Sequence, residues 1–170
     1  MINQVYRLVS PGMIDVACTE PDLTKSVILR PEYMSICKAD QRYYLGNRGK
    51  EALAEKLPMA LIHECCARVI YDPTGHFKPG EIVVPVPNTP TEDDDVIAEN
   101  YRRTSHFCSS GYDGFLRDYI DIDYDRLVRV PEGLDLKIAS FTELISVAVH
   151  AVSRFEKSTV SSKSSEAKRE

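Results

Sequence analysis

Apolar positions in the first 130 residues come in short runs separated by turn residues. The runs with the strongest strand character are residues 4–8, 26–30, 67–71, 81–86, 116–122 and 126–130. Turn signals such as Asp72-Pro-Thr-Gly75 and Lys78-Pro-Gly80 stand between them, and the second run is expected to end at Pro31 because proline cannot donate to a sheet ladder. Many short strands with this punctuation predict a mainly β, barrel-like fold.

Two segments follow a helical pattern instead. Residues 50–56 are rich in good helix formers and predict a short helix. From Asp135 onward, a longer helix is predicted by apolar residues at helical spacing, namely Ile138, Phe141, Ile145, Ala148, Val149 and Val152. Residues 156–170 are mostly Ser, Lys and Glu, a composition that cannot bury enough surface to order itself. We therefore expect a folded domain over residues 1–155 and a disordered polar tail over 156–170.

Composition and charge narrow the function classes. Apolar residues make up 43% of the 170 positions and the formal net charge is -5, which is ordinary for a soluble globular domain. No cluster of basic residues resembles a nucleic-acid footprint, and the apolar runs are too short to span a bilayer. The N-terminus lacks the features of a signal peptide. We expect a cytoplasmic protein whose partner is a small molecule rather than nucleic acid or membrane.

Candidate metal ligands stand at three places in the chain. Cys37 follows a strand-like run, His63 and Glu64 form a dipeptide after another, and Glu143 lies on the predicted late helix. A thiolate, an imidazole and carboxylates suit zinc. Taken singly, each has a more common interpretation. Cys37 could be a small core residue, the His63-Glu64 dipeptide a polar turn, and Glu143 a solvent-facing residue of its helix. The five cysteines form no CxxC pair, so a zinc ribbon has no support.

Six motifs, taken in order, resemble the zinc-dependent medium-chain dehydrogenase/reductase family. The first, Ser35-Ile-Cys37-Lys-Ala-Asp40, is similar to the family's Gly-Ile-Cys-Gly-Ser-Asp, and the second, Leu61-Ile-His63-Glu64, to its Gly-His-Glu. The other four are Phe77-Lys-Pro-Gly80-Glu-Ile-Val-Val84, Gly111-Tyr-Asp-Gly114-Phe-Leu-Arg-Asp-Tyr119, Leu127-Val-Arg-Val-Pro131-Glu-Gly133 and Thr142-Glu143-Leu-Ile-Ser-Val147-Ala-Val-His150-Ala. No single motif is specific for this family, but the set of six in this order is.

The resemblance implies a fold and a metal. The fold is a GroES-like, partly open β-barrel with short helices, the N-terminal catalytic domain of such enzymes. Cys37, His63 and Glu64 match the ligand positions of the polyol branch, which bind one catalytic zinc ion. Glu143 matches a nearby carboxylate that either binds zinc directly or holds its water. Asp40 matches a position that supports the cysteine loop.

The resemblance also implies catalytic roles. We expect them at Glu64, Asp40 and Tyr43. A hydroxyl residue often relays the proton in this family, but the corresponding position here is Ala39. Proton delivery is therefore expected to use water, Tyr43 or Glu64. The glycine that precedes the family's histidine is Ile62 here, and the four-cysteine structural zinc lobe is missing.

Within the family, the chain resembles bacterial ribulose-5-phosphate reductases of the teichoic-acid and CDP-ribitol pathway. Residues 34–44, 57–59 and 87–91 carry this likeness. It implies reduction of D-ribulose 5-phosphate to D-ribitol 5-phosphate with NADPH. No Gly-x-Gly-x-x-Gly turn is present, although such a turn binds the dinucleotide in a Rossmann domain. We therefore expect a chain truncated before that domain, with no cofactor-binding residues of its own, and inactive alone.

Two alternatives stay open from the sequence. One is another polyol dehydrogenase of the same family, because the zinc ligands do not determine the substrate. The other is a GroES-like module without catalysis. The expected partner is a small sugar phosphate or polyol, and NADPH belongs to the complete enzyme only. A homodimer or a cytidylyltransferase partner is possible for that complete enzyme.

Overall fold

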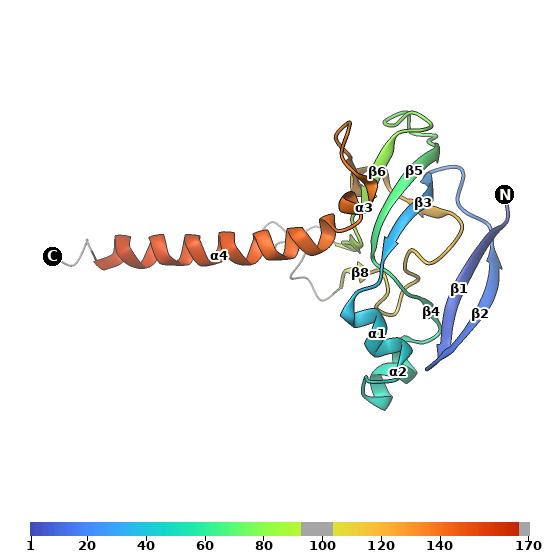
Figure 1. The fold of residues 1–170 in the computed structure, drawn as a ribbon, viewed down its shortest axis with the longest axis horizontal. Coiled ribbons are helices and arrows are strands. Elements are labelled where there is room, and N and C mark those ends of the chain that lie inside the picture. The colour runs from blue at the N-terminus through green and yellow to red at the C-terminus, as the bar shows by residue number, and fades with distance from the viewer. Residues whose placement is uncertain (93–103, 167–170) are drawn as a thin grey trace.

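The protein folds around a curled, barrel-like arrangement of sheets (Figure 1). The computed structural model describes residues 1–92 and 104–166, with side chains as far as residue 156. In these residues a five-stranded sheet has the order β10 (Leu127–Arg129), β6 (Ile82–Pro85), β5 (Glu64–Tyr71), β3 (Val27–Ser35) and β9 (Ile120–Ile122). A three-stranded sheet has the order β2 (Met13–Thr19), β1 (Asn3–Ser10) and β4 (Met59–Ala60). The predicted mainly β, partly open barrel is confirmed.

Short elements complete the described fold. β7 (Asn88–Thr89) pairs with β8 (His106–Phe107) in a separate two-stranded sheet. The helices are α1 (Lys38–Tyr44), α2 (Lys50–Lys56), the 3-10 turn η2 (Tyr124–Arg126), α3 (Leu136–Ala139) and α4 (Thr142–Glu166). The helix predicted over residues 50–56 has the observed bounds of α2.

The hydrophobic core lies between the two larger sheets. Leu8 and Met59 come from the three-stranded sheet, whereas Leu29 and Val69 come from the five-stranded sheet, and all four are almost fully buried. Phe115, in the segment before β9, is buried in the same cluster. Alternate residues of each strand point inward because successive side chains in a strand face opposite sides. This shared core fixes the two sheets relative to each other and so positions the loops between them.

Two predicted strand boundaries differ from the structure. β3 continues through Pro31 to Ser35, because its pairing with β5 shifts register between Pro31 and Tyr33; proline is tolerated at such an irregularity. β9 occupies only the end of the run predicted over residues 116–122. The Leu116 amide instead donates to the Leu61 carbonyl, and the Leu116 carbonyl accepts from the Tyr6 amide, outside any regular strand.

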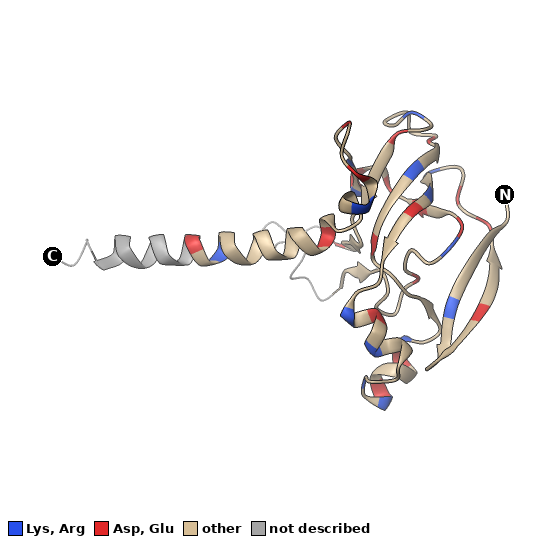
Figure 2. Ribbon diagram, in the orientation of Figure 1, with Lys and Arg blue, Asp and Glu red and all other residues tan. Residues whose placement is uncertain are grey.

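The long helix α4 projects away from the barrel (Figure 1). Its predicted apolar positions are largely solvent-exposed, including Ile145, Val149 and Val152. Figure 2 shows few charges along the described part of this helix. Its backbone is helical through Glu166, and the disordered tail expected over residues 156–170 stays a prediction. Among the described residues, no helix has a stretch that is both long and apolar enough to cross a membrane.

Candidate metal centre

Cys37 stands at the junction between β3 and α1, where the chain turns from strand to helix. Its backbone is extended, with φ -88° and ψ 176°, and it forms the N-cap of α1. The Cys37 amide donates to Asp40 Oδ2 at 3.0 Å, which satisfies one of the backbone donors left free at a helix N-terminus. Asp40 is buried, so its carboxylate fixes the cysteine turn from the inside.

His63 and Glu64 lie where the chain leaves β4 and enters β5. The residue before them, Ile62, has φ 72°, the left-handed conformation that glycine adopts without strain. The Ile62 amide donates to Asp40 Oδ1 at 2.9 Å, and its carbonyl accepts from the Phe115 amide at 2.7 Å. One carboxylate therefore holds both turns that carry candidate ligands.

Glu143 comes to the same place from the far end of the chain. Glu64 pairs in register with Ser35 at the end of β3. The buried Ser35 hydroxyl lies 3.0 Å from the buried Ser140 hydroxyl at the end of α3, within hydrogen-bonding distance. Ala139 is also buried, in a small cluster with residues of β5 and β6. These contacts fix the start of α4, which places Glu143 beside Glu64.

The predicted ligands converge into two overlapping groups. Cys37, Asp40 and His63 form one, and His63, Glu64 and Glu143 form the other; within each group, the potential ligand atoms lie within 4.8 Å of one another. Cys37 Sγ is 3.9 Å from His63 Nε2. Mixed sulfur, nitrogen and oxygen donors at this spacing suit a zinc-sized ion. The two groups share His63, and residues as far apart in the sequence as His63 and Glu143 lie in one of them.

Three acidic groups of this cluster have raised pKa values. Burial is the main cause that raises the pKa of Glu64; nearby His63 opposes the rise, whereas Glu143 and Asp40 add to it. Burial also raises the pKa of Glu143. The Cys37 thiol has its pKa raised to about 11, first by burial and then by its hydrogen bond to Asp40. A bound cation would favour the ionised form of all three groups.

The His63 ring is placed to serve as a ligand. Its Nδ1 is buried and has no hydrogen-bond partner among the described residues, although buried polar atoms nearly always have one. The ring packs against Phe107 with centroids 5.4 Å apart and planes at 61°. An imidazole whose Nε2 lies 3.9 Å from the Cys37 thiol, that thiol and two carboxyl groups are donors of the kinds that zinc binds.

Tyr43, one of the expected routes for proton delivery, lies on the inner side of α1. It is 3% exposed and belongs to the main core cluster. The Arg48 guanidinium lies 4.6 Å from the centre of its ring, within cation–π range. The structure therefore gives Tyr43 a packing role, and its part in proton delivery stays a prediction.

Sequence reasoning missed the residues that orient this cluster. Ser35 and Ser140 connect β3 to the start of α4, and Ser109 donates to Asp40 Oδ1 at 3.0 Å. Phe107 packs on the His63 ring. Serine is common in surface turns, and nothing in its local sequence indicates a contact with a residue 69 or 105 positions away.

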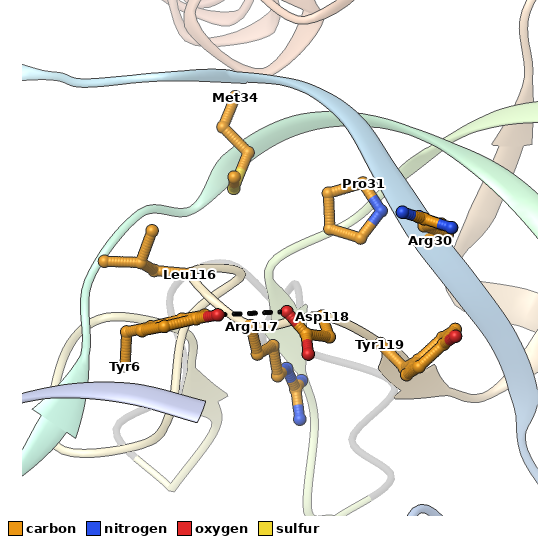
Figure 3. Close-up of a pocket in the computed structure, with 8 residues that line it drawn as sticks. All are labelled: Tyr6, Arg30, Pro31, Met34, Leu116, Arg117, Asp118 and Tyr119. Carbon is orange, nitrogen blue, oxygen red and sulfur yellow. Dashed lines mark hydrogen bonds between the residues drawn. The ribbon is translucent and has the colours of Figure 1, made fainter. Parts of the chain in front are cut away.

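One hollow borders the ligand turns, and a second lies apart from them. The first, of about 540 Å³, has a lining that includes Ile36, Asp40 and Ile62 together with mostly apolar neighbours. The other, of about 320 Å³, lies between β1, β3 and residues 116–119, where Tyr6 bonds to Asp118 (Figure 3). None of the predicted site residues lines this second hollow. The first hollow borders the turns that carry Cys37 and His63, and its lining includes Asp40 but none of the four candidate ligands.

The fold and the ligand cluster define a class of protein. Residues 24–132 match the alcohol dehydrogenase GroES-like domain, and the chain belongs to this family. It is 54% identical over 164 residues to ribulose-5-phosphate reductase 1 of Staphylococcus aureus, covering 96% of this chain and 48% of that protein. It is 57% identical over 158 residues to ribulose-5-phosphate reductase of Bacillus spizizenii, covering 92% and 46%. The resemblance read from the motifs is thus confirmed.

A solved structure agrees with this relationship. The crystal structure of S. aureus TarJ in complex with NADPH superposes with a TM-score of 0.74 at 44% identity, covering 94% of this chain and 43% of that chain. The chain therefore spans about half the length of the relatives it matches.

Proposed function

We propose that this chain forms the metal-binding catalytic half of a zinc-dependent reductase. The observation that carries the proposal is that two groups of potential ligand atoms share His63: Cys37 and Asp40 complete one group, and Glu64 and Glu143 complete the other. Cys37, His63 and Glu64 are the proposed protein ligands, and Glu143 binds the ion directly or through water. Three protein ligands and one open position are the usual arrangement of a catalytic zinc site.

The chemistry proposed for the site is polarisation of a ketone. Zinc, when bound, supplies a Lewis acid for a carbonyl oxygen. Cys37 would hold the ion as a thiolate, so its thiol, with a pKa of about 11, would have to release its proton to solvent when the metal binds. Asp40 keeps the two ligand turns in place through its bonds to Cys37 and Ile62. Glu64 and water are the proposed routes for the proton that reaches the product oxygen.

The proposed substrate comes from the relatives. Two proteins more than 50% identical to the chain are named ribulose-5-phosphate reductases, and the S. aureus structure holds NADPH. We infer that a complete enzyme built on this half reduces D-ribulose 5-phosphate to D-ribitol 5-phosphate, with hydride from NADPH and a proton from solvent. In this proposal the half of the relatives that the chain does not match contributes the cofactor site.

Metal analysis tests the first part of the proposal. The purified chain, prepared without chelator, should contain about one equivalent of zinc, and Cys37→Ser and His63→Ala should lose it. Cys18→Ser is a matched control, because Cys18 is exposed on β2. A wild-type chain that contains no metal and binds no added zinc would favour the non-catalytic module.

A fusion tests the activity. The chain is joined after α4 to the second half of the S. aureus relative, and NADPH oxidation is followed with D-ribulose 5-phosphate. Activity should depend on zinc and fall steeply in Cys37→Ser but not in Cys18→Ser. A panel with fructose and other ketoses tests the alternative polyol substrate. Greater activity with an unphosphorylated ketose would overturn the sugar-phosphate assignment.

A further inference from the structure

Two residues beside the candidate ligands adopt a left-handed backbone without being glycine. They are Ile62, with φ 72°, and Ser109, with φ 61°. This conformation is sterically unfavourable for a residue with a Cβ and is especially rare for a β-branched residue. Such strain persists only where surrounding contacts determine the backbone. The contacts of these two residues should therefore show what the strain maintains.

Both residues bond to the same oxygen atom. The Ile62 amide donates to Asp40 Oδ1 at 2.9 Å, and the Ser109 hydroxyl donates to it at 3.0 Å. The other carboxylate oxygen accepts from the Cys37 amide at 3.0 Å. Asp40 and Ser109 are buried. One carboxylate thus connects the turn before Cys37, the turn before His63 and a third segment that carries no ligand.

That third segment, the 107–111 turn, is fixed against the histidine turn by other contacts. The Gly111 amide lies 3.1 Å from Met59 Sδ, and Lys56 Nζ donates to Ser110 Oγ at 2.7 Å. Phe107 packs on the His63 ring. Because the 107–111 turn is anchored independently, the Ser109 hydroxyl reaches Asp40 from a fixed position.

We propose that Ser109 is a positioning residue of the metal centre, an inference that rests on the proposed function. Its hydroxyl orients the Asp40 carboxylate, and Asp40 in turn fixes the backbone next to Cys37 and His63. Removing the hydroxyl leaves Asp40 Oδ1 with one of its two observed donors in a buried setting, where a missing bond is costly. The carboxylate can then rotate, and the two ligand turns lose their common anchor.

Cobalt binding tests the proposal without any enzymatic activity. The 170-residue chain is titrated with Co²⁺ against a competing chelator, and thiolate-to-cobalt absorption reports on Cys37. Ser109→Ala should weaken cobalt affinity ~10–100-fold, as expected for loss of a group that supports metal ligands. Ser110→Ala is the matched control, because this neighbouring hydroxyl bonds to Lys56 instead. Its affinity should stay close to that of the wild type.

Ser109→Gly separates the hydroxyl from the backbone. Glycine removes the strain at φ 61° but also removes the hydroxyl, so it should fold stably and still bind cobalt as weakly as Ser109→Ala. Wild-type affinity in Ser109→Gly or Ser109→Ala would overturn the proposal. A wild-type chain that binds no cobalt would overturn the proposed metal centre and this inference with it.

Hydrogen exchange in the metal-free chain gives a second readout. The amides of Cys37 and Ile62 should exchange faster in Ser109→Gly than in Ser110→Ala, whereas amides in β5 should not differ. Equal protection of Cys37 and Ile62 in the two variants would contradict the proposed coupling through Asp40.

Discussion

Gly114 lies so close to Ile62 that a Cβ at position 114 would overlap the Ile62 carbonyl oxygen. The same Cβ would overlap the carbonyl of Leu61. The close approach exists because the amides of Gly114 and Phe115 donate to the carbonyls of Ala60 and Ile62 at 2.8 and 2.7 Å. Residues 114–116 thus hold the chain that leads into His63, and glycine is required where the two backbones meet.

Gly114→Ala should destabilise the protein by ~3 kcal/mol, because the overlapped atoms are backbone and cannot move aside alone. Gly49→Ala is the matched control, since a Cβ there meets nothing within 4 Å. The free energies of unfolding are measured by chemical denaturation of the metal-free chain. Similar stability of the two variants would contradict the close approach.

At position 62, the glycine variant should be more stable than the alanine variant, which is the reverse of the usual order of stability. In regular structure glycine is less stable than alanine by ~0.5–1 kcal/mol, but at φ 72° the Cβ itself carries strain. Ile62→Gly should therefore be more stable than Ile62→Ala by ~1 kcal/mol. Val27, buried in β3, is the control, where the glycine variant should be the weaker one. The denaturation midpoints of all four variants test this reversal. An Ile62→Ala variant more stable than Ile62→Gly would contradict the strain at position 62.

The bonds of Asp113 predict that the stability of the protein depends on pH in a way that is separate from the metal centre. It accepts three hydrogen bonds from Arg7, at 3.0, 3.1 and 2.6 Å, and one from the Ala60 amide at 2.9 Å. Burial alone would raise the pKa of Asp113, but the bonds from Arg7 and Ala60 outweigh it and hold the pKa below its ordinary value. Its contribution to stability is therefore complete above the unfolded pKa of ~3.9 and is lost as pH falls through the lower folded value.

Asp113→Asn should cost ~2 kcal/mol at neutral pH, and this difference from wild type should shrink as pH falls below ~4. Unfolding is measured in urea between neutral and acidic pH. The comparison isolates Asp113, because Glu64 and Glu143 are unchanged and their raised pKa values act in the opposite direction. A difference that stays constant with pH would refute the assignment.

The sequence predicted those parts of the fold that depend on local patterns. Alternating apolar runs and proline or glycine turns indicated β1, β5 and β6, and helix formers indicated α2. It did not predict β2, most of whose residues are exposed, because without a buried face there is no apolar alternation to detect. It also missed α1, a short helix whose start depends on the bond between Cys37 and Asp40.

The candidate ligands could be named from motif resemblance, but their meeting could not be derived from residue spacing. Glu143 reaches Glu64 through the contact between Ser35 and Ser140, and a long-range contact of this kind leaves no local pattern. Ile62 is instructive in another way. The family pattern has glycine at this position, and the observed φ of 72° gives the physical reason for that preference.

The sequence pattern predicted one helix from Asp135 onward, which the structure divides into α3 and α4, and the pattern could not say what covers the apolar positions of α4. Val152 is 58% exposed on α4, whereas Val69 of β5 is 1% exposed. Because burial determines the cost of losing methyl groups, Val69→Ala should lower the free energy of unfolding by ~2 kcal/mol. Val152→Ala should change it by less than ~0.5 kcal/mol, since exposed sites tolerate substitution and alanine favours helix. Both variants are compared by urea denaturation at low protein concentration. An equally large loss in Val152→Ala would mean that α4 packs against the barrel or another chain in solution.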